Sequence, residues 1–267
     1  MTAIQILSDL HLEAIKSYDV FEIVPKAPYL ALLGDIGNMT LHKDECLRFL
    51  TRQLQQFRAV LFVPGNHEAY HSNWPDTLAV LRTFEQHVRT DASLGDFVLL
   101  DRGVFRVPDS DIVILGCSLF SHVPPEFVQA VSMGLNDFHY IKDWDVKAHN
   151  EAHGRDLAWL NAQVAALEQE PNVKIAIFSH WSPSQDARAI EPRHVGSRIS
   201  SAFSTDLSGE KSFTSGRVKV WASGHTHFNY DFMVERADGA GPLRLVTNQY
   251  GYYFAQAGGF DGGKTIN

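Results

Sequence analysis

The chain has 267 residues, of which 45% are hydrophobic and 20% are charged, and its formal net charge is −8. This length and composition are typical of a folded globular protein, and we expect one domain over residues 1–267 with a glycine-rich tail from about residue 254. The acidic balance argues against duplex nucleic acid as a partner, because sequence-independent binding to phosphate backbones depends on clustered Lys and Arg.

The N-terminus and the cysteines favour a cytoplasmic protein. An apolar strand pattern begins within the first three residues, which leaves no room for a signal peptide, and no apolar run approaches the length of a membrane span. The two cysteines, Cys46 and Cys117, neighbour no ligand motif. We expect both to be buried free thiols in a reducing compartment.

The first third of the chain alternates short apolar runs with helical patterns. Each apolar run is predicted to be a buried strand that ends in polar side chains, and the order predicts parallel strands whose carboxyl ends meet at one edge. Leucine and phenylalanine stripes predict the two helices. The elements are strand 3–8 before Asp9 and His11, strand 29–33 before Asp35, helix 41–57, strand 59–63 before Asn66 and His67, and helix 73–87.

The middle of the chain has a different rhythm. Three strand patterns at 97–100, 103–107 and 111–115 are separated by short turns and predict β-hairpins in a second layer. Residues 118–144 are irregular apart from a short helix near 127–133. We interpret this segment as a loop that selects the substrate, with His139 as a candidate contact, although a packed connection with buried aromatic side chains is an equally good alternative.

A long helix is predicted at 145–170 from a stripe of leucine and valine. Its His149 and His153 are four residues apart, a spacing that can bind metal. No flanking carboxylate or cysteine completes such a site, so we expect both imidazoles on a solvated face.

The last third supplies two more strands that end in histidine. Strand 173–178 leads to His180, and strand 218–222 leads to His225 and His227. The polar stretch 185–216 between them is predicted to be a solvated loop, in which Arg198 is a candidate phosphate contact. A hairpin through 238–241 leads to strand 243–247 and to Tyr250, another candidate substrate contact, and the glycine-rich residues 258–263 are expected to be loosely ordered.

The strand ends together supply donors for metal ions. Oxygen and nitrogen ligands without thiolate suit Mn, Fe, Zn, Ni or Co. Seven ligands exceed the need of one ion, so we expect two ions that share a bridging carboxylate. Each motif alone is equally explained by a turn, and only their ordered combination points to a metal centre. The donors are the carboxylates of Asp9 and Asp35, the imidazoles of His11, His180, His225 and His227, and the amide oxygen of Asn66.

These motifs, in this order, resemble those of the calcineurin-like metallophosphoesterases. The likeness covers most of the chain, and it is to a small branch of that family without a cap domain. The motifs are Asp9-x-His11, Gly34-Asp35, Gly65-Asn66-His67-Glu68, His180 and Gly224-His225-x-His227. The resemblance implies an α/β fold, a four-layer αββα sandwich of two mixed β-sheets flanked by helices. It also implies that one ion is held by Asp9, His11, Asp35 and His227, and the other by Asp35, Asn66, His180 and His225.

The resemblance further implies hydrolysis of a phosphomonoester or phosphodiester of a small molecule. Hydroxide held between the two ions would attack phosphorus, with Asp35 as the bridging ligand and His67 as the general acid for the departing oxygen. One alternative is that the same centre acts on a specialised non-nucleotide biosynthetic intermediate, since a fold does not fix its substrate. A non-catalytic scaffold is disfavoured because no ligand is missing.

Overall fold

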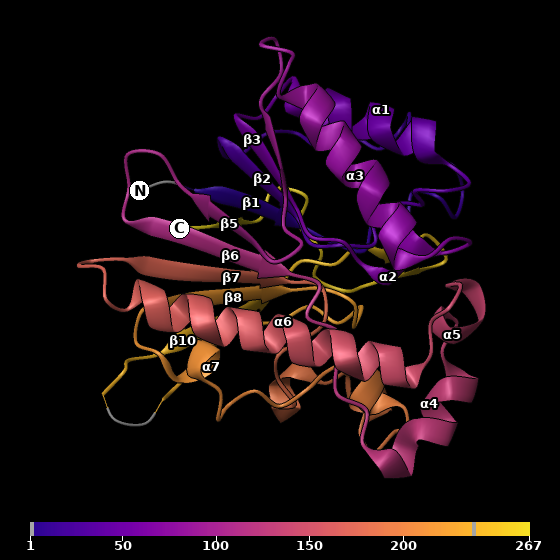
Figure 1. The fold of residues 1–267 in the computed structure, drawn as a ribbon, viewed down its shortest axis with the longest axis vertical. Coiled ribbons are helices and arrows are strands. Elements are labelled where there is room, and N and C mark those ends of the chain that lie inside the picture. Colours follow the sequence, from indigo (N-terminus) through magenta and orange to yellow (C-terminus); the bar gives the residue numbers. More distant parts are fainter. Residues whose placement is uncertain (1–2, 237–238) are drawn as a thin grey trace.

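Two β-sheets lie face to face at the centre of the protein, as the computed structural model of residues 3–236 and 239–267 shows (Figure 1). The first sheet has the strand order β13-β1-β2-β3-β4 and the second β5-β6-β7-β8-β10-β9. Strands β1 to β4 run parallel, as do β6, β7, β8 and β10. Strands β13, β5 and β9 pair antiparallel at sheet edges.

The strands are short, and β1, β2 and β3 are buried along their whole length. The strands of the first sheet are β1 Ile4–Leu7, β2 Tyr29–Leu32, β3 Ala59–Phe62, β4 Asp96–Leu99 and β13 Thr265–Ile266. Those of the second are β5 Gly103–Arg106, β6 Ile112–Cys117, β7 Lys174–Ser179, β8 Val218–Ser223, β9 Asp231–Val234 and β10 Leu243–Thr247. A small ribbon joins β11 Gly251–Tyr252 to β12 Ala255–Gln256.

Helices cover the outer faces of both sheets. Helices α1 (Lys43–Leu54) and α3 (Trp74–Val88) pack on the first sheet, and α6 (Val146–Leu167) and α7 (Lys211–Thr214) on the second (Figure 1). The predicted four-layer αββα sandwich is therefore confirmed. Three short helices lie at one end of it: α2 (Asn66–Ala69), α4 (Val128–Gly134) and α5 (Asp137–Tyr140). The 3₁₀ turns are Pro125–Phe127, Ala187–Ala189, Pro192–His194 and Ser200–Ala202.

The apolar core between the sheets explains why the strands have no polar face. In β1, Ile4 and Ile6 point into the space between the sheets, whereas Leu7 points toward the helices. The buried Gln5 on that helical side is satisfied, because its amide donates to the carbonyl oxygen of Gly262 at 2.7 Å. Strands buried on both faces are apolar throughout, as parallel sheets require.

Two segments differ from the sequence prediction. Strand β4 is not part of a second-layer hairpin; it pairs parallel with β3 in the first sheet, because α3 provides the crossover that a parallel strand needs. Only β5 and β6 form the predicted hairpin. The glycine-rich C-terminus is not a loose tail, since β13 pairs with β1 and buries Ile266. The hairpin turn predicted at 238–241 lies partly outside the described residues.

The histidines of α6 also differ from the prediction. His149 and His153 are buried, and they hold the segment that follows β6. The backbone N–H of Ser121 donates to His149 Nε2 at 3.1 Å, and His153 Nδ1 donates to the carbonyl oxygen of Leu119 at 3.0 Å. Their four-residue spacing therefore serves backbone hydrogen bonds that no local pattern could reveal.

The segment held in this way is strained. Leu119 and Phe120 have φ angles of 76° and 54°, in the left-handed region that bulky side chains rarely adopt. Asp156 of α6 accepts the backbone N–H of Leu119 at 2.9 Å and adds a third contact to those of the histidines. Such conformations persist only where surrounding contacts fix them.

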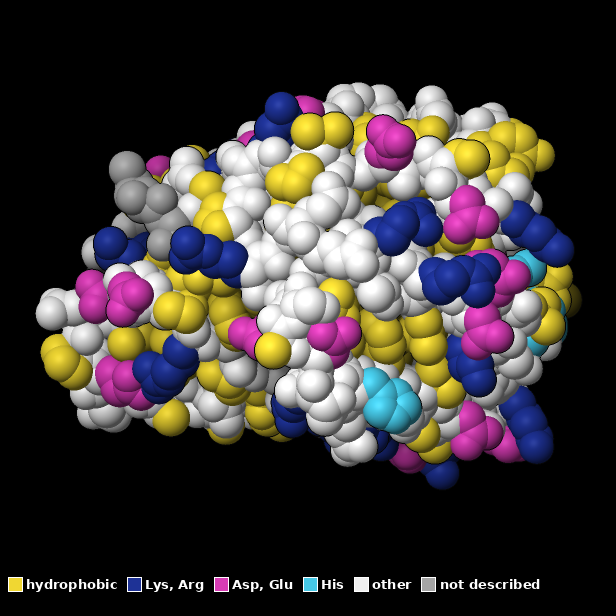
Figure 2. All heavy atoms as spheres, turned by 90° about the horizontal axis from the view of Figure 1, so that it is seen from above, with side chains coloured by type: hydrophobic (Ala, Val, Ile, Leu, Met, Phe, Trp, Pro, Cys, Tyr) yellow, Lys and Arg dark blue, Asp and Glu magenta, His cyan; other side chains and the backbone are white. Residues whose placement is uncertain are grey.

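The cysteines, the length of the helices and the surface charge were also subjects of prediction. Cys46 and Cys117 are buried free thiols, as expected. None of the helices in the described part of the chain is both long and apolar enough to cross a membrane. On the face seen in Figure 2, Lys and Arg side chains are interspersed with Asp and Glu and form no purely basic surface.

We expect His149 to make stability depend on pH. Burial, together with the nearby His153, lowers the pKa of His149 from 6.5 to about 3. Between these pH values the unfolded chain binds more protons, so the free energy of unfolding falls as the pH decreases from about 6.5 toward 3. Urea denaturation of metal-free protein at pH 7 and pH 5 measures this loss.

The matched variant is His149→Gln, whose amide oxygen can still accept from Ser121 but does not titrate. Its free energy of unfolding should fall less than that of the wild type between the two pH values. Equal losses in both proteins would show that His149 contributes nothing to the pH dependence.

Candidate metal centre

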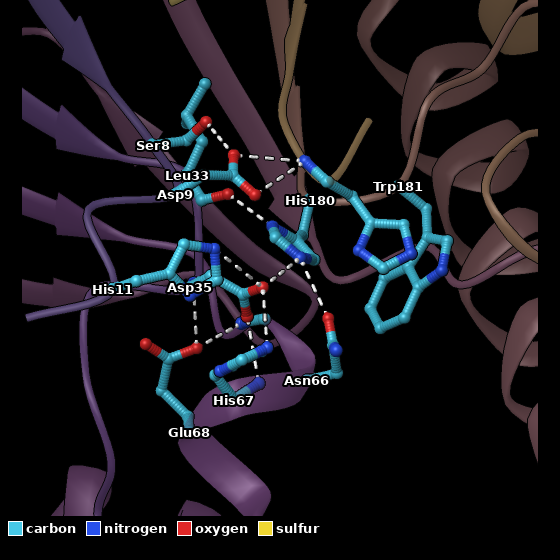
Figure 3. A network of polar contacts seen from close by, with 12 residues as sticks. Ser8, Asp9, His11, Leu33, Asp35, Asn66, His67, Glu68, His180 and Trp181 are labelled. Atoms are coloured by element: carbon cyan, nitrogen blue, oxygen red, sulfur yellow. Dashed lines mark hydrogen bonds and ion pairs between the residues drawn. The ribbon is translucent and has the colours of Figure 1, made fainter. Parts of the chain in front are cut away.

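All seven predicted ligands lie at one end of the sandwich, beyond the carboxyl ends of β1, β2, β3, β7 and β8. Figure 3 labels Asp9, His11, Asp35, Asn66 and His180 among them. Both sheets contribute because their parallel strands end at the same edge. The backbone at the ligands is not extended, since five of the seven residues have positive φ. These are Asp9 at 53°, His11 at 45°, Asp35 at 54°, His225 at 68° and His227 at 51°.

Left-handed conformations of this kind cost about 1–3 kcal/mol each and cluster at functional sites. They turn the chain sharply as each strand ends, so that the next side chain points into the centre. Asp and His tolerate this region better than most residues. Five candidate ligands thus have strained backbones. The orientation of their side chains is maintained at this edge at a cost to the stability of the fold.

The side chains form two neighbouring groups. In the first, ligand atoms of Asp9, His11 and His227 lie within 4.8 Å of one another, and His227 Nε2 is 3.3 Å from Asp9 Oδ1. In the second, ligand atoms of Asp35, His180 and His225 lie within the same distance of one another. Each group presents nitrogen and oxygen atoms to a common centre, as the coordination of a divalent cation requires.

Asp35 lies between the two groups. Its Oδ2 is 3.4 Å from His180 Nε2 in the second group and 4.0 Å from His11 Nε2 in the first. Asn66 joins the second group, with its Oδ1 3.1 Å from His180 Nε2. One carboxylate can thus face both centres, as a bridging ligand must.

The hydrogen bonds of the imidazoles leave lone pairs for a cation. His180 Nδ1 is 2.7 Å from the carbonyl oxygen of Leu33 and donates to it, so Nε2 is the unprotonated nitrogen when the ring is neutral. His225 Nε2 is buried and has no hydrogen-bond partner among the described residues. Burial, followed by the neighbouring His180, lowers the pKa of His225 well below its ordinary value. A neutral buried imidazole with an unused nitrogen fits a metal ligand.

Two glycines make room for this packing. A Cβ atom at Gly34, where φ is 90°, would lie 2.3 Å from His180 Nδ1. A Cβ atom at Gly65 would lie 2.3 Å from Asp35 Oδ1. Any side chain at either position would displace a candidate ligand, which explains why glycine precedes Asp35 and Asn66 in the sequence.

Glu68 fixes the turns that carry Asp35 and Asn66. Its buried carboxylate accepts the backbone N–H groups of Asp35 at 3.0 Å, Ile36 at 2.8 Å, Gly37 at 3.2 Å and Gly65 at 2.7 Å. Burial and the neighbouring Asp35 raise the pKa of Glu68 to about 7, although the backbone donors favour its charged form. Nothing in the sequence beyond its place in the motif pointed to this role of Glu68.

Asp137 holds the amide of Asn66. Its Oδ1 accepts Asn66 Nδ2 at 2.9 Å and the hydroxyl of Tyr70 at 2.7 Å. The amide nitrogen is thereby turned away from the centre, and Asn66 Oδ1 faces His180. In the predicted substrate-selecting loop 118–144, the residue that reaches the site is therefore Asp137 and not His139.

His67 has a carboxylate on one side and a phenol on the other. Its Nδ1 is 2.7 Å from Glu13 Oε1, and its Nε2 is 3.2 Å from the hydroxyl of Tyr252 and 3.9 Å from Asp35 Oδ2. Burial opposes protonation of His67, but Asp35 and Glu13 outweigh it and raise the pKa to about 9. The imidazoles of His11 and His67 lower the pKa of Glu13 to about 2 despite its burial. Glu13, His11 and His67 also form a third group of close ligand atoms.

The pocket over the centre has a volume of about 270 Å³ and a lining that differs from the predicted substrate contacts. None of His139, Arg198 and Tyr250 is among its described lining residues; His139 and Arg198 are exposed, and Tyr250 packs against the core under α1 and α3. Residues close to each of them in the sequence line the pocket instead, namely Asp137, Arg193 and Tyr252.

A four-layer sandwich whose two sheets deliver carboxylates, imidazoles and an amide to one edge is the architecture of a metal-dependent hydrolase. Residues 3–229 match the family model described as calcineurin-like phosphoesterase. The chain belongs to this family, and it is a metal-dependent hydrolase of phosphoesters.

Two similar proteins extend this comparison. The chain is 26% identical over 272 residues to the uncharacterized protein L509 of Acanthamoeba polyphaga mimivirus, which covers 94% of this chain and 92% of the viral protein. Its fold is similar to that of the phosphopantetheinyl hydrolase PptH from Mycobacterium tuberculosis, with a TM-score of 0.63 and 17% identity. That match covers 94% of this chain and 90% of the mycobacterial one, and it concerns the fold alone.

We expect Glu68→Ala to destabilise the protein strongly. The substitution leaves four buried backbone N–H groups without their acceptor, and we expect the free energy of unfolding to fall by about 3 kcal/mol or more. Urea denaturation measures this change. Glu126→Ala, on an exposed turn, is the matched control and should change stability by less than about 0.5 kcal/mol. A similar small loss in both variants would contradict the assigned role of Glu68.

Proposed function

We propose that this centre holds two metal ions and hydrolyses a phosphomonoester or phosphodiester of a small molecule. The observation that supports it is the position of Asp35, whose Oδ2 faces a histidine of each ligand group. A single buried carboxylate placed between two sets of nitrogen and oxygen donors is difficult to explain as packing, because an unpaired buried charge is costly.

The assignment of ligands follows the two groups. Asp35 is shared, and the ions are of the Mn, Fe, Zn, Ni or Co class, which mixed nitrogen and oxygen donors suit. When bound, such a cation pair lowers the pKa of a water molecule and neutralises negative charge on the phosphoryl oxygens. One ion would be held by Asp9, His11, Asp35 and His227, and the other by Asp35, Asn66, His180 and His225.

His67 is the general acid of the proposed reaction. Glu13 holds its Nδ1, which orients the ring so that Nε2 faces the pocket with Tyr252 beside it. A cation on Asp35 would offset the charge of that carboxylate, so Glu13 is the partner that keeps His67 protonated in the loaded enzyme. From this position His67 donates its proton to the departing oxygen of the ester.

The pocket suits a small substrate. Its volume of about 270 Å³ is close to the lower end of ligand sites in proteins, roughly 300–1,000 Å³. Arg193 on its wall is a cation that can face phosphate oxygens. The class of ester named in the mycobacterial phosphopantetheinyl hydrolase is one of those to include in a substrate panel.

The experiment that tests this function is release of nitrophenolate from mono- and bis-nitrophenyl phosphate by protein reconstituted with each of the five metals. We expect turnover with at least one metal, and Asp35→Ala to lose both ions and the activity, because Asp35 faces both groups. Metal analysis of the purified variant provides the second readout. Asp44→Ala, on the exposed start of α1, is the control and should retain two ions.

Two results would overturn the proposal. One is absence of turnover of every ester, including phosphopantetheine esters, in protein shown to contain two ions. The other is an Asp35→Ala protein that still binds two ions tightly.

We expect His67→Ala to retain its metals and to lose activity in a manner that depends on the leaving group. General acid catalysis typically contributes about 10²–10⁴-fold to rate, and it matters most where the departing oxygen is strongly basic. The rate on an alkyl phosphate should fall by that amount, whereas the rate on nitrophenyl phosphate should change little.

The control for this comparison is His139→Ala, an exposed histidine on α5 outside the pocket lining. It should leave both rates unchanged, and Glu13→Gln should show a weaker form of the His67 pattern. An equal loss of rate on both esters in His67→Ala would exclude His67 as the general acid.

A further inference from the structure

We infer that an apolar cavity beside the metal centre binds an alkyl or small aryl substituent of the substrate, so that the preferred substrates are phosphoesters of apolar alcohols. This inference rests on the proposed function and specifies its substrate class. Its basis is the lining of the cavity, the residues it shares with the pocket over the centre, and its size.

The cavity is formed by the 3₁₀ turns between β7 and β8, in the part of the chain predicted to be a solvated loop. Its apolar walls are the side chains of Ala189, Ile190, Ile199 and Phe203, of which Ala189 is buried and the others are half-buried, and three serines and Thr226 complete the lining with Glu191 and His194. The described lining contains no Lys or Arg, and the Oε2 atom of Glu191 is 3.4 Å from His194 Nε2 and 2.7 Å from Arg193 Nε. The guanidinium beside the cavity is thus paired with Glu191, and the apolar walls suit an apolar group better than a second phosphate.

The cavity adjoins the metal centre. His194, Phe203 and Thr226 line both this cavity and the pocket that contains the candidate ligands. The ring of Phe203 stacks on the candidate ligand His225, with ring centroids 4.9 Å apart and an interplanar angle of 25°. One face of Phe203 therefore packs against the centre, so an ester whose phosphorus lies at the ligands can place one substituent in the cavity.

The size of the cavity limits the substituent. Its volume is about 120 Å³. An engineered apolar cavity of about 150 Å³ stays dry and accepts benzene, so this one is suited to a chain of about three to five carbons or a small ring. Placing an alkyl group against these apolar walls is favourable because it removes apolar surface from water.

The test compares p-nitrophenyl methyl phosphate with p-nitrophenyl butyl phosphate on the metal-reconstituted enzyme. Both esters release nitrophenolate, so they differ only in the retained alkyl group. Three further methylene groups buried in an apolar site should raise kcat/KM by roughly 10- to 100-fold. Equal kcat/KM values for the two esters would overturn the inference and leave the phosphoesterase proposal intact.

Substitutions at Ile190 test whether the preference for the butyl ester arises in this cavity. Ile190→Trp places a larger ring in the cavity and should bring the butyl-to-methyl ratio of kcat/KM close to one. Ile190→Ala enlarges the cavity and should shift the preference toward longer chains, such as hexyl. Val195→Trp is the matched control, because Val195 is 69% exposed and is not among the lining residues. Its ratio should equal that of the wild type, and a ratio lost equally in Val195→Trp would contradict the location.

A binding measurement separates this inference from the proposed function. Calorimetry of the metal-loaded protein with methylphosphonate and butylphosphonate requires no turnover. Butylphosphonate should bind roughly 10- to 100-fold more tightly, and Ile190→Trp should remove this difference. Tighter binding of butylphosphonate without hydrolysis of any ester would refute the proposed function and retain the apolar subsite. Equal binding of the two phosphonates would refute the subsite.

Discussion

The arrangement of the site depends on one constraint, that parallel strands from both sheets end at the same edge of the sandwich. Each strand is too apolar to carry a functional side chain along its length, so the polar residues occur where the strands stop. The chain turns there in left-handed conformations, and Glu68 ties the turn after β2 to the turn after β3 by four backbone hydrogen bonds. Residues far apart in the sequence are thus held within a few ångströms of one another.

Holding the ligands in this way is costly in the absence of cations. Asp9 and Asp35 are buried carboxylates, and the imidazole nitrogens of His11 and His227 lie 3.0 Å apart. Removing two carboxylates from water costs several kcal/mol, which their histidine and backbone partners offset in part, and the strained backbone adds to this cost. The rigid layers and the Glu68 clamp offset that cost, and bound metal would contribute further, because ions that bind only the folded chain stabilise it. The same contacts that preorganise the ligands at this edge therefore also make the stability of the protein depend on bound metal.

Sequence patterns were sufficient for the candidate ligands but not for the groups that position them. Asp9, Asp35 and His180 directly follow or lie close behind apolar strands, and parallel topology then brings them together whatever the loops between them do. Asp137 and Tyr252 come from irregular segments, where no periodicity fixes the side that a residue faces. The predicted contacts His139 and Tyr250 are accordingly each two residues away from the residue that reaches the pocket. An error of two residues in a loop changes the direction of a side chain completely, whereas an error of two residues in a strand does not.

The histidines of α6 show that a sequence pattern can also suggest a metal site where the structure has none. His149 and His153 have a spacing that can bind metal, yet they serve a structural role because the groups opposite them are backbone atoms of the strained segment after β6. That segment leads into α4 and α5, and α5 carries Asp137 against the amide of Asn66. Helix α6 therefore acts on the centre indirectly, by fixing the start of the connection that orients one of its ligands. Chemistry at the strand ends can stay constant while irregular segments such as 118–144 and 185–216 change, and substrate choice follows from the surfaces that these segments present.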